Sequence, residues 1–588
     1  MGEQDLGLRY WGRQRVTRRR VLSGAVAGGA ALGAVALVGC KSDKKTNGGG
    51  DGTVVPPTST VNDGYQDGPA QPGGILRVRQ AAALPSMNVF GPGIFPLAQG
   101  LTLGFTIFDH LFYVPTDTGQ LELFLATSVE QVDDQGLEII VTIGDATFHD
   151  KAPVSGRKVL ASDVVASYLR FRDEVPIGYS WLHDVLDTME ATDDKTIRIR
   201  QKFPWAWLYT SSNAGSPIFS SIMPEEILQD ADFMQKDGIG SGHWVLQSHD
   251  NGANVKFRKF QNFRTFQNGR DIAGQPYMNG LDFVFITDDN AALAAFLDGE
   301  VDTLGFTSKS QMDDVISRLG DRIVTGSDLA RDYFNLMLNV KQAPMFEDER
   351  IRRAFNKLID RGEIIQLMEE GDGVKAAPIP PAHKRYVLPE DDADLVDYWA
   401  TDVAEAKSLL DAASFDYGQE IEMKHSNRVG DAELALVLQQ QLARGGVKVR
   451  LLQEDLVRWF SQTLNQHDFK MTCFQHLAYE DVDLPLRFYM GADTSAGRPS
   501  NFMDFVDADV DAAVLAAAQE LDEEARVEKV LEAQRVIMRK AAPMFNTHSS
   551  INFAGRYEYL KGAITGRGSL GLFNRTTWFS DEQRRLET

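Results

Sequence analysis

The chain has 588 residues, of which 43% are hydrophobic and 24% charged, a balance typical of globular proteins and unlike a disordered acidic tail. With 60 Lys and Arg against 83 Asp and Glu, the net charge of -23 disfavours binding to nucleic acid or to anionic membranes through a basic face. Only two cysteines occur, Cys40 and Cys473, which excludes a disulfide framework and CxxC zinc sites. At about 150 residues per compact unit, the length favours two subdivided lobes over one barrel.

The first 39 residues have the features of an export signal. Six arginines lie in residues 1–20, among them Arg18 and Arg19, and an uncharged stretch follows from Val21 to Gly39. This order resembles a twin-arginine signal. The sequence Leu37-Val38-Gly39-Cys40 resembles a lipoprotein cleavage box, which implies removal of residues 1–39 and lipidation of Cys40. The alternative is a transmembrane helix, but five Gly and six Ala make this stretch weakly apolar.

Residues 40–73 are predicted to form a lipid-anchored flexible linker. This stretch is rich in Gly, Pro, Ser, Thr, Asn and Asp and has few apolar residues, so burial cannot offset the entropy lost on ordering. A tether of this length typically spans roughly 30 Å.

The segments that follow intermix strands and helices. The pattern predicts a strand at residues 75–78 and a hairpin partner over 135–147. Amphipathic spacing predicts helices, with Ser162 or Asp163 as the cap of the first, and a strand follows Gly445-Gly446. The helices are expected at 161–169, 363–369, 431–442 and 522–539, and the strand at 447–451.

Several motifs occur in an order that is specific to one protein family. The most specific block runs from Leu338-Asn339 through Pro344 and Asp348-Glu349-Arg350-Ile351-Arg352-Arg353 to Ile359-Asp360-Arg361. Other motifs are Phe148-His149-Asp150, Gly240-Ser241-Gly242-His243-Trp244, Tyr277-Met278-Asn279-Gly280 and Gly299-Glu300-Val301-Asp302. Together they resemble the family 5 extracellular solute-binding proteins, which serve ABC importers. Within the block, Pro344 and Asp348 are expected to set a loop and a helix start, and Arg352 and Arg353 to pair with acids at the lobe seam.

This resemblance implies an α/β fold of the periplasmic-binding-protein type II, with two lobes, hinge strands and an extra small subdomain on lobe one. Lobe one would comprise residues 72–328 plus 546–588, with the subdomain at about 115–205, and lobe two residues 329–545. Two strands should cross between the lobes, near residues 331–336 and 542–546. A ligand would favour the closed state through contacts that the open state lacks.

The resemblance also indicates where a ligand would bind. The family segment "G-W-x-A-D-Y-x-D-P", whose first Asp takes a peptide α-ammonium, corresponds to Phe474–Asp483, and Tyr479 replaces that Asp. Glu480 or Asp481 could substitute, although a shift of one residue along a strand reverses the side. Trp205 and Trp207 share a face if extended, either as subdomain core or as a stacking platform. The candidate ligand-binding residues are Trp205, Trp207, Phe474, Gln475, His476, Tyr479, Asp481, Asn546 and His548.

The predicted function is that of an extracytoplasmic, lipid-anchored receptor that captures short peptides and delivers them to ABC permease subunits. It is expected to be a monomer without cofactor, metal or catalysis, since HExxH, GxSxG and GKS/T motifs are absent from the sequence. Alternatives are an oligosaccharide- or nickel-binding importer component, a ligand-sensing co-receptor of the same fold, and an exported hydrolase. His476 stays open as a nickel or haem ligand.

Overall fold

The computed structural model describes residues 69–586 except 85, 89–102, 105, 114–120, 134, 175–180, 210–219, 229, 251, 268, 477–480, 492–500 and 563–574. The predicted signal with Arg18 and Arg19, the lipidation residue Cys40, the linker up to residue 68 and the candidate Tyr479 lie outside the described residues. No described helix is both long enough and apolar enough to span a membrane.

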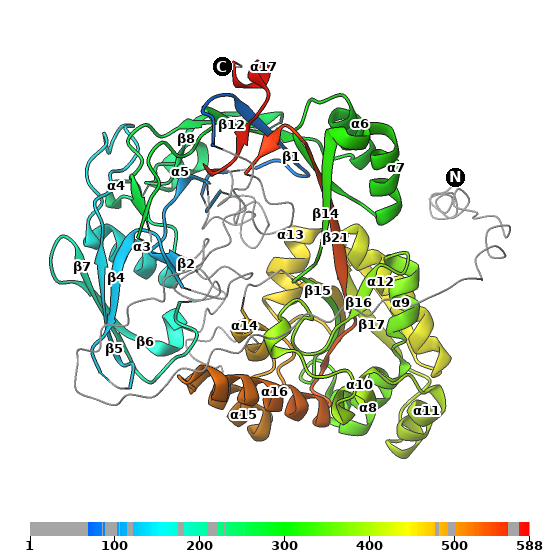
Figure 1. Ribbon diagram of the computed structural model, residues 1–588. Coiled ribbons are helices and arrows are strands. Elements are labelled where there is room, and N and C mark those ends of the chain that lie inside the picture. Colours follow the sequence, from blue (N-terminus) through cyan, green and yellow to red (C-terminus); the bar gives the residue numbers. More distant parts are fainter. Residues whose placement is uncertain are drawn as a thin grey trace, which may run out of the picture. The chain divides into compact units, whose positions relative to one another are not determined.

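An eight-stranded sheet is formed by strands from both ends of the described chain (Figure 1). Its order is β14-β21-β13-β1-β12-β9-β8, with β16 also paired to β21. The predicted strand at 75–78 is confirmed as part of β1, which lies between parallel neighbours β12 and β13. These strands are β1 Ile75–Gln80, β8 Trp244–Asp250, β9 Asn254–Lys259, β12 Gly280–Phe285, β13 Thr303–Phe306, β14 Ile323–Leu329, β16 Gly373–Lys375 and β21 His548–Tyr557. Helices α6 (Asp289–Leu297) and α7 (Lys309–Leu319) pack against β13.

A separate four-stranded sheet, in the order β4-β5-β7-β6, is inserted in the chain between β1 and β8. The prediction of a hairpin between residues 75–78 and 135–147 is wrong, because β5 pairs with β4 and β7 and not with β1. Its alternating residues Ile139 and Val141 face the core, under helix α3. The elements are β4 Ala126–Gln131, β5 Glu138–Ile143, α3 Ala161–Glu174, η1 Trp181–Val185, β6 Leu186–Ala191 and β7 Thr196–Gln201. This insert is the small subdomain; its outer bounds of 115 and 205 stay a prediction.

Helix α3 does not start with the predicted cap. It begins at Ala161, so Ser162 and Asp163 lie in its first turn. The carboxylate of Asp163 instead accepts the N–H of Leu160, at 2.9 Å, and pairs with the guanidinium of Arg157, at 2.6 Å.

A five-stranded sheet, in the order β18-β17-β19-β15-β20, forms the second lobe. Strands β17, β18 and β19 run parallel, while β15 is antiparallel to β19 and β20. The strands are β15 Tyr333–Leu338, β17 Glu420–Ser426, β18 Lys448–Glu454, β19 Met471–His476 and β20 Met544–Asn546. The longer helices of this lobe are α8 Glu349–Leu358, α9 Arg361–Met368, α10 Ala393–Trp399, α11 Val403–Ala412, α12 Val429–Arg444, α15 Ala508–Gln519 and α16 Glu523–Arg539, and the short α14 is Asp483–Arg487.

Helix α12 packs against β17, β18 and β19 through the predicted apolar stripe. Leu434, Leu438 and Leu442 are fully buried, and Val437 is half-buried. The structure confirms the helices predicted at 161–169, 363–369, 431–442 and 522–539 and the strand predicted at 447–451. Most of these elements begin or end a few residues away from the predicted bounds.

Two short passages lead directly from a strand of one large sheet to a strand of the other, and the segment between β15 and β17 also supplies β16 to the eight-stranded sheet. The first lies between β14, which ends at Leu329, and β15, which begins at Tyr333. The second is Thr547, between β20 and β21. Strand β16 pairs with the first residues of β21 and so lines the second passage. Both passages lie at or beside the predicted crossing strands.

The motif block forms a loop and a capped helix. Pro344 begins the short 3-10 helix Pro344–Glu347, and the carboxylate of Asp348 accepts the N–H of Arg350, at 2.9 Å, at the start of α8. Arg353 pairs with an acid, Glu349, at 2.8 Å, but within the same helix and not at the lobe seam. The expectation that Arg352 pairs with acids is wrong, because its guanidinium donates to backbone carbonyls, among them that of Ala541, at 2.8 Å.

Three further pairs of short strands complete the described chain. They are β2 Phe112–Tyr113 with β3 Glu122–Leu123, β10 Phe266–Gln267 with β11 Arg270–Asp271, and β22 Leu560–Lys561 with β23 Trp578–Phe579.

Two leucines on α12 provide a matched test of this packing. Leu438→Ala should lower the free energy of unfolding by about 2–5 kcal/mol, because Leu438 is fully buried and its removal leaves a cavity. Leu436 lies on the same helix and is 41% exposed. Leu436→Ala should therefore change the free energy of unfolding by less than about 0.5 kcal/mol. Urea unfolding followed by circular dichroism measures both, and equal effects would contradict the orientation of α12.

Candidate functional site

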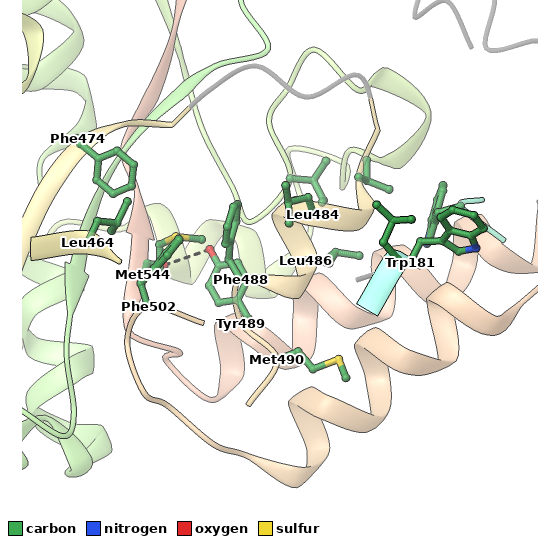
Figure 2. Close-up of a cluster of buried hydrophobic side chains, with 14 of the residues drawn as sticks. Trp181, Leu464, Phe474, Leu484, Leu486, Phe488, Tyr489, Met490, Phe502 and Met544 are labelled. Atoms are coloured by element: carbon green, nitrogen blue, oxygen red, sulfur yellow. Dashed lines mark hydrogen bonds between the residues drawn. The ribbon is translucent and has the colours of Figure 1, made fainter. Parts of the chain in front are cut away.

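The end of β19 brings two predicted residues into an aromatic cluster. His476 lies opposite Tyr333 of β15, with the two rings stacked at 5.1 Å between centroids. Phe474 and Phe488 lie 4.5 and 4.4 Å from the His476 ring, and both belong to the buried cluster of Figure 2. Burial lowers the pKa of His476 to about 3, so its imidazole is neutral at physiological pH.

The Nε2 atom of His476 has no hydrogen-bond partner among the described residues. A buried polar atom left without a partner costs about 1–3 kcal/mol. A neutral imidazole at this place can donate or accept one hydrogen bond, so it suits an uncharged polar group.

Gln475 belongs to a polar network beside the first passage. Its side-chain amide donates to Asp332 Oδ2, at 2.7 Å, and its side-chain oxygen accepts a hydrogen bond from Arg428. Its backbone N–H donates to Asp431 Oδ1, at 2.8 Å. Burial raises the pKa of Asp431. The network thus ties β19 and α12 to the passage.

Asn546 and His548 flank the second passage. The backbone N–H of Asn546 donates to the Tyr398 hydroxyl, and its side-chain amide to the carbonyl of Ala377, at 2.8 and 2.6 Å. His548 stacks on Phe334 at 4.7 Å, and its Nε2 lies 3.1 Å from Glu369 Oε1. These two predicted residues therefore hold the passage to elements of the second lobe.

The sequence analysis missed two buried residues at the same place. Arg361 donates to the carbonyl of Asn546, at 2.8 Å, and its guanidinium lies 4.4 Å from the centre of the Tyr398 ring. Burial lowers the pKa of Arg361 below its ordinary value. Asn335, opposite Asn546 and Phe474 in the sheet, is fully buried, and both its side-chain polar atoms have no partner among the described residues. The position of Asn335 inside the apolar run Tyr-Phe-Asn-Leu-Met-Leu was the sequence signal that could have pointed to this residue.

A family model described as "Bacterial extracellular solute-binding proteins, family 5 Middle" matches residues 120–497. The chain belongs to this family.

Several curated proteins resemble this family 5 protein at low identity. The oligopeptide-binding protein AppA of Bacillus subtilis (strain 168) is 24% identical over 378 residues, which cover 60% of this chain and 64% of the relative. The glutathione-binding protein GsiB of Pectobacterium atrosepticum is 24% identical over 282 residues, covering 47% of this chain and 50% of the relative. In both matches the chain spans less than two thirds of the relative's length.

Solved structures of similar fold cover most of this family 5 protein. The binding protein AgaA of A. tumefacien R10, in complex with agropinic acid, has a TM-score of 0.73 at 20% identity and covers 87% of this chain and 99% of its own. AppA of Bacillus subtilis, in complex with a nonapeptide, has a TM-score of 0.71 at 20% identity over 87% of this chain and 100% of its own. This similarity shows the two-lobed type II fold.

In this family 5 protein, Trp205 and Trp207 lie in a turn and are not extended. Both side chains are buried. The guanidinium of Arg487 lies 4.9 Å from the centre of the Trp205 ring, and the Tyr386 ring meets the edge of Trp207 at 5.8 Å. The two tryptophans therefore contact the second lobe in addition to the subdomain core.

Asp481 lies just before α14 and is buried. Its carboxylate accepts the N–H of Asp483, at 3.0 Å. Within the described ranges no group of three or more His, Cys, Asp or Glu side chains is arranged to hold a metal ion, and the rings near His476 are those of Tyr333, Phe474 and Phe488.

The depressed pKa of His476 predicts a specific pH dependence of stability. Its folded pKa of about 3 lies below the ordinary histidine value of 6.5, so the unfolded chain binds one more proton between these values. The free energy of unfolding should therefore fall as pH drops through this window, and His476→Phe should remove up to about 1.4 kcal/mol per pH unit of that slope. Urea unfolding at pH 5, 6 and 7 measures it. Buried His110 and His149 are present in both the parent chain and the variant, so their contributions to the slope cancel in the comparison. Identical slopes would show that His476 is charged or exposed in the folded chain.

Proposed function

We propose that this protein is the extracytoplasmic substrate-binding component of an ABC importer, which captures short peptides by lobe closure and delivers them to permease subunits. The observation that supports this most is the family match together with two lobes joined by two short passages. Such a fold changes its lobe angle through a few backbone torsions, so a ligand that contacts both lobes favours the closed state.

Peptides are the first-ranked ligand because relatives AppA and DppE of Bacillus subtilis are named oligopeptide- and dipeptide-binding proteins. The structural neighbours AgaA, in complex with agropinic acid, and NikZ of Campylobacter jejuni, in complex with Ni(L-His), keep other small solutes as the second candidate. The uncharged surroundings of His476 favour an uncharged part of the ligand at that place.

The proposal includes the anchor and the lobe bounds. Residues 1–39 would be removed, Cys40 would carry the lipid, and residues 40–73 would tether the lobes to the membrane. Lobe one would comprise residues 72–328 and 546–588, and lobe two 329–545. The protein would act as a monomer and without catalysis. A ligand-sensing co-receptor of the same fold is the alternative, and loss of peptide uptake on gene deletion would favour import.

Thermal-shift screening tests the substrate class directly. The full chain with Cys40→Ser, which cannot receive the lipid, is screened against short peptides, oligosaccharides and Ni²⁺ with histidine. A ligand at 100 times its dissociation constant stabilises the folded state by about 2.7 kcal/mol, which for a chain of this size raises the melting temperature by roughly 2–3 °C. Peptides should give this shift. If only a sugar or nickel does, the peptide assignment is wrong.

Asp481 is the proposed partner of the peptide α-ammonium. Asp481→Asn keeps an oxygen for the N–H of Asp483 but removes the charge. The dissociation constant for a free tripeptide such as trialanine should rise at least tenfold, since a charge-assisted hydrogen bond is lost. N-acetyl-trialanine is the control, and its binding should not differ between the two chains. Equal weakening of both peptides would remove Asp481 from this role.

A further inference from the structure

Two parts of the chain that belong to different sheets meet away from the backbone passages. The turn with Trp205 and Trp207 and the short helix η1 lie in the insert between β1 and β8. Helices α14, α15 and α16 lie between β19 and β20 of the five-stranded sheet. Contacts between these parts are therefore contacts between the lobes.

One of these contacts is a largely buried ion pair with an aromatic neighbour. The Arg487 guanidinium, at the end of α14, lies 2.9 Å from Asp184 Oδ2 of η1. The exposed fractions of the two side chains are only 3% and 14%. The same guanidinium lies over the Trp205 ring, 4.9 Å from its centre. A cation held between a carboxylate and an aromatic face, away from water, is sensitive to the loss of either partner.

Trp207 and its neighbour add a second set of contacts. Its ring meets Tyr386 edge-on at 5.8 Å and lies 5.1 Å from the guanidinium of Arg526 on α16. The backbone N–H of Ala206 donates to the carbonyl of Ala518 on α15, at 2.8 Å. This turn of the subdomain is thus joined to three segments of the second lobe.

Apolar burial is continuous across the same contact. Figure 2 shows Trp181 of η1 in one buried cluster with Leu484 and Leu486 of α14. The indole N–H of Trp181 donates to Gln201 Oε1, at 2.8 Å, which fixes the ring within the subdomain. Separation of the lobes would expose these side chains to water, so the apolar contact favours closure.

We infer that Asp184, Trp205, Trp207, Tyr386 and Arg487 form an inter-lobe clasp that holds the lobes closed and sets how slowly a captured solute is released. The contacts of Arg487 with Asp184 and Trp205, and of Trp207 with Tyr386, join side chains of different lobes, so opening breaks them together. Arg487 ends helix α14, which begins two residues after Asp481, so the clasp is close in the chain to the segment proposed to contact the ligand. This role in release rests on the proposed function, whereas the effect on lobe closure does not.

Distances between the lobes test the clasp without any ligand. Spin labels are placed on Glu130→Cys of β4 and Glu528→Cys of α16, both exposed, in the full chain with Cys40→Ser; the remaining Cys473 is buried. The ligand-free chain should show a populated short distance. Asp184→Asn and Trp205→Leu should each lower the ratio of short to long distances at least tenfold, with unchanged far-ultraviolet circular dichroism.

A matched ion pair within one lobe is the control. Glu363 pairs with Arg444 at 2.7 Å, joining α9 to α12 of the second lobe, so Glu363→Gln should leave the distances unchanged. The double variant Asp184→Lys with Arg487→Glu restores opposite charges and should recover the short distance. Unchanged distances in Asp184→Asn and Trp205→Leu, or only a long distance in the parent chain, would overturn the clasp.

With trialanine as the probe, Asp184→Asn should release peptide at least tenfold faster with less than a twofold change in association rate. If trialanine does not bind any variant, the peptide proposal is weakened while the distances still decide the clasp.

Discussion

The two backbone passages between the large sheets are the constraint on which the molecule depends. The chain joins the two sheets most directly at Thr547 and at the short segment after Leu329, where a few backbone torsions can absorb relative motion of the lobes. The lobe-two side of the second passage is held firmly. Both backbone groups of Asn546 are bonded to side chains, its N–H to Tyr398 and its carbonyl to Arg361. The N–H of Thr547 also donates to the carbonyl of Phe334, at 2.8 Å, so the passage itself is tied to β15.

The passages and the clasp differ in how their charged groups are held. Near the passages the neutral imidazole of His476 lies among aromatic rings, and Gln475 stands between the charged groups of Asp332 and Arg428. Arg361, the buried cation there, donates to carbonyls and to an amide oxygen. At the clasp, by contrast, Arg487 meets the carboxylate of Asp184. Charges at a contact that opens can return to water, whereas a charge at a hinge that stays buried must be satisfied in both states.

This division suits the proposed role of a receptor that must both hold and release a solute. A closed state stabilised only by the ligand would open as soon as the ligand left, whereas one stabilised too strongly by lobe contacts would close without ligand. The clasp contributes to the free energy of lobe closure independently of the solute. The solute therefore needs to supply only the remaining part of that free energy. The tryptophans thereby contribute to the lobe interface, a role that neither a pure core residue nor a stacking platform would have.

The sequence by itself determined the local elements and the family. Amphipathic spacing placed α12 and α16, and Asp348 capped α8 as expected, because capping and helical periodicity depend on residues within one or two turns. The motif order also indicated the two-lobed fold and put the crossings beside residues 331 and 546. Strand partnership was not determined locally: β5 was assigned to the wrong sheet, and Arg352 found carbonyls in place of acids.

The candidate site shows the same limit. The sequence proposed His476, Asn546 and His548 as ligand contacts, which stays a prediction. It did not point to Arg361, Asn335 or the partner of Trp205, since contacts across 150 or more residues leave no periodic trace in the sequence. Only the tertiary structure decided which of these polar groups lack a partner and which lobe each tryptophan meets. Burial, hydrogen-bond satisfaction and charge pairing are properties of packed neighbours, and the neighbours are set by how the sheets assemble.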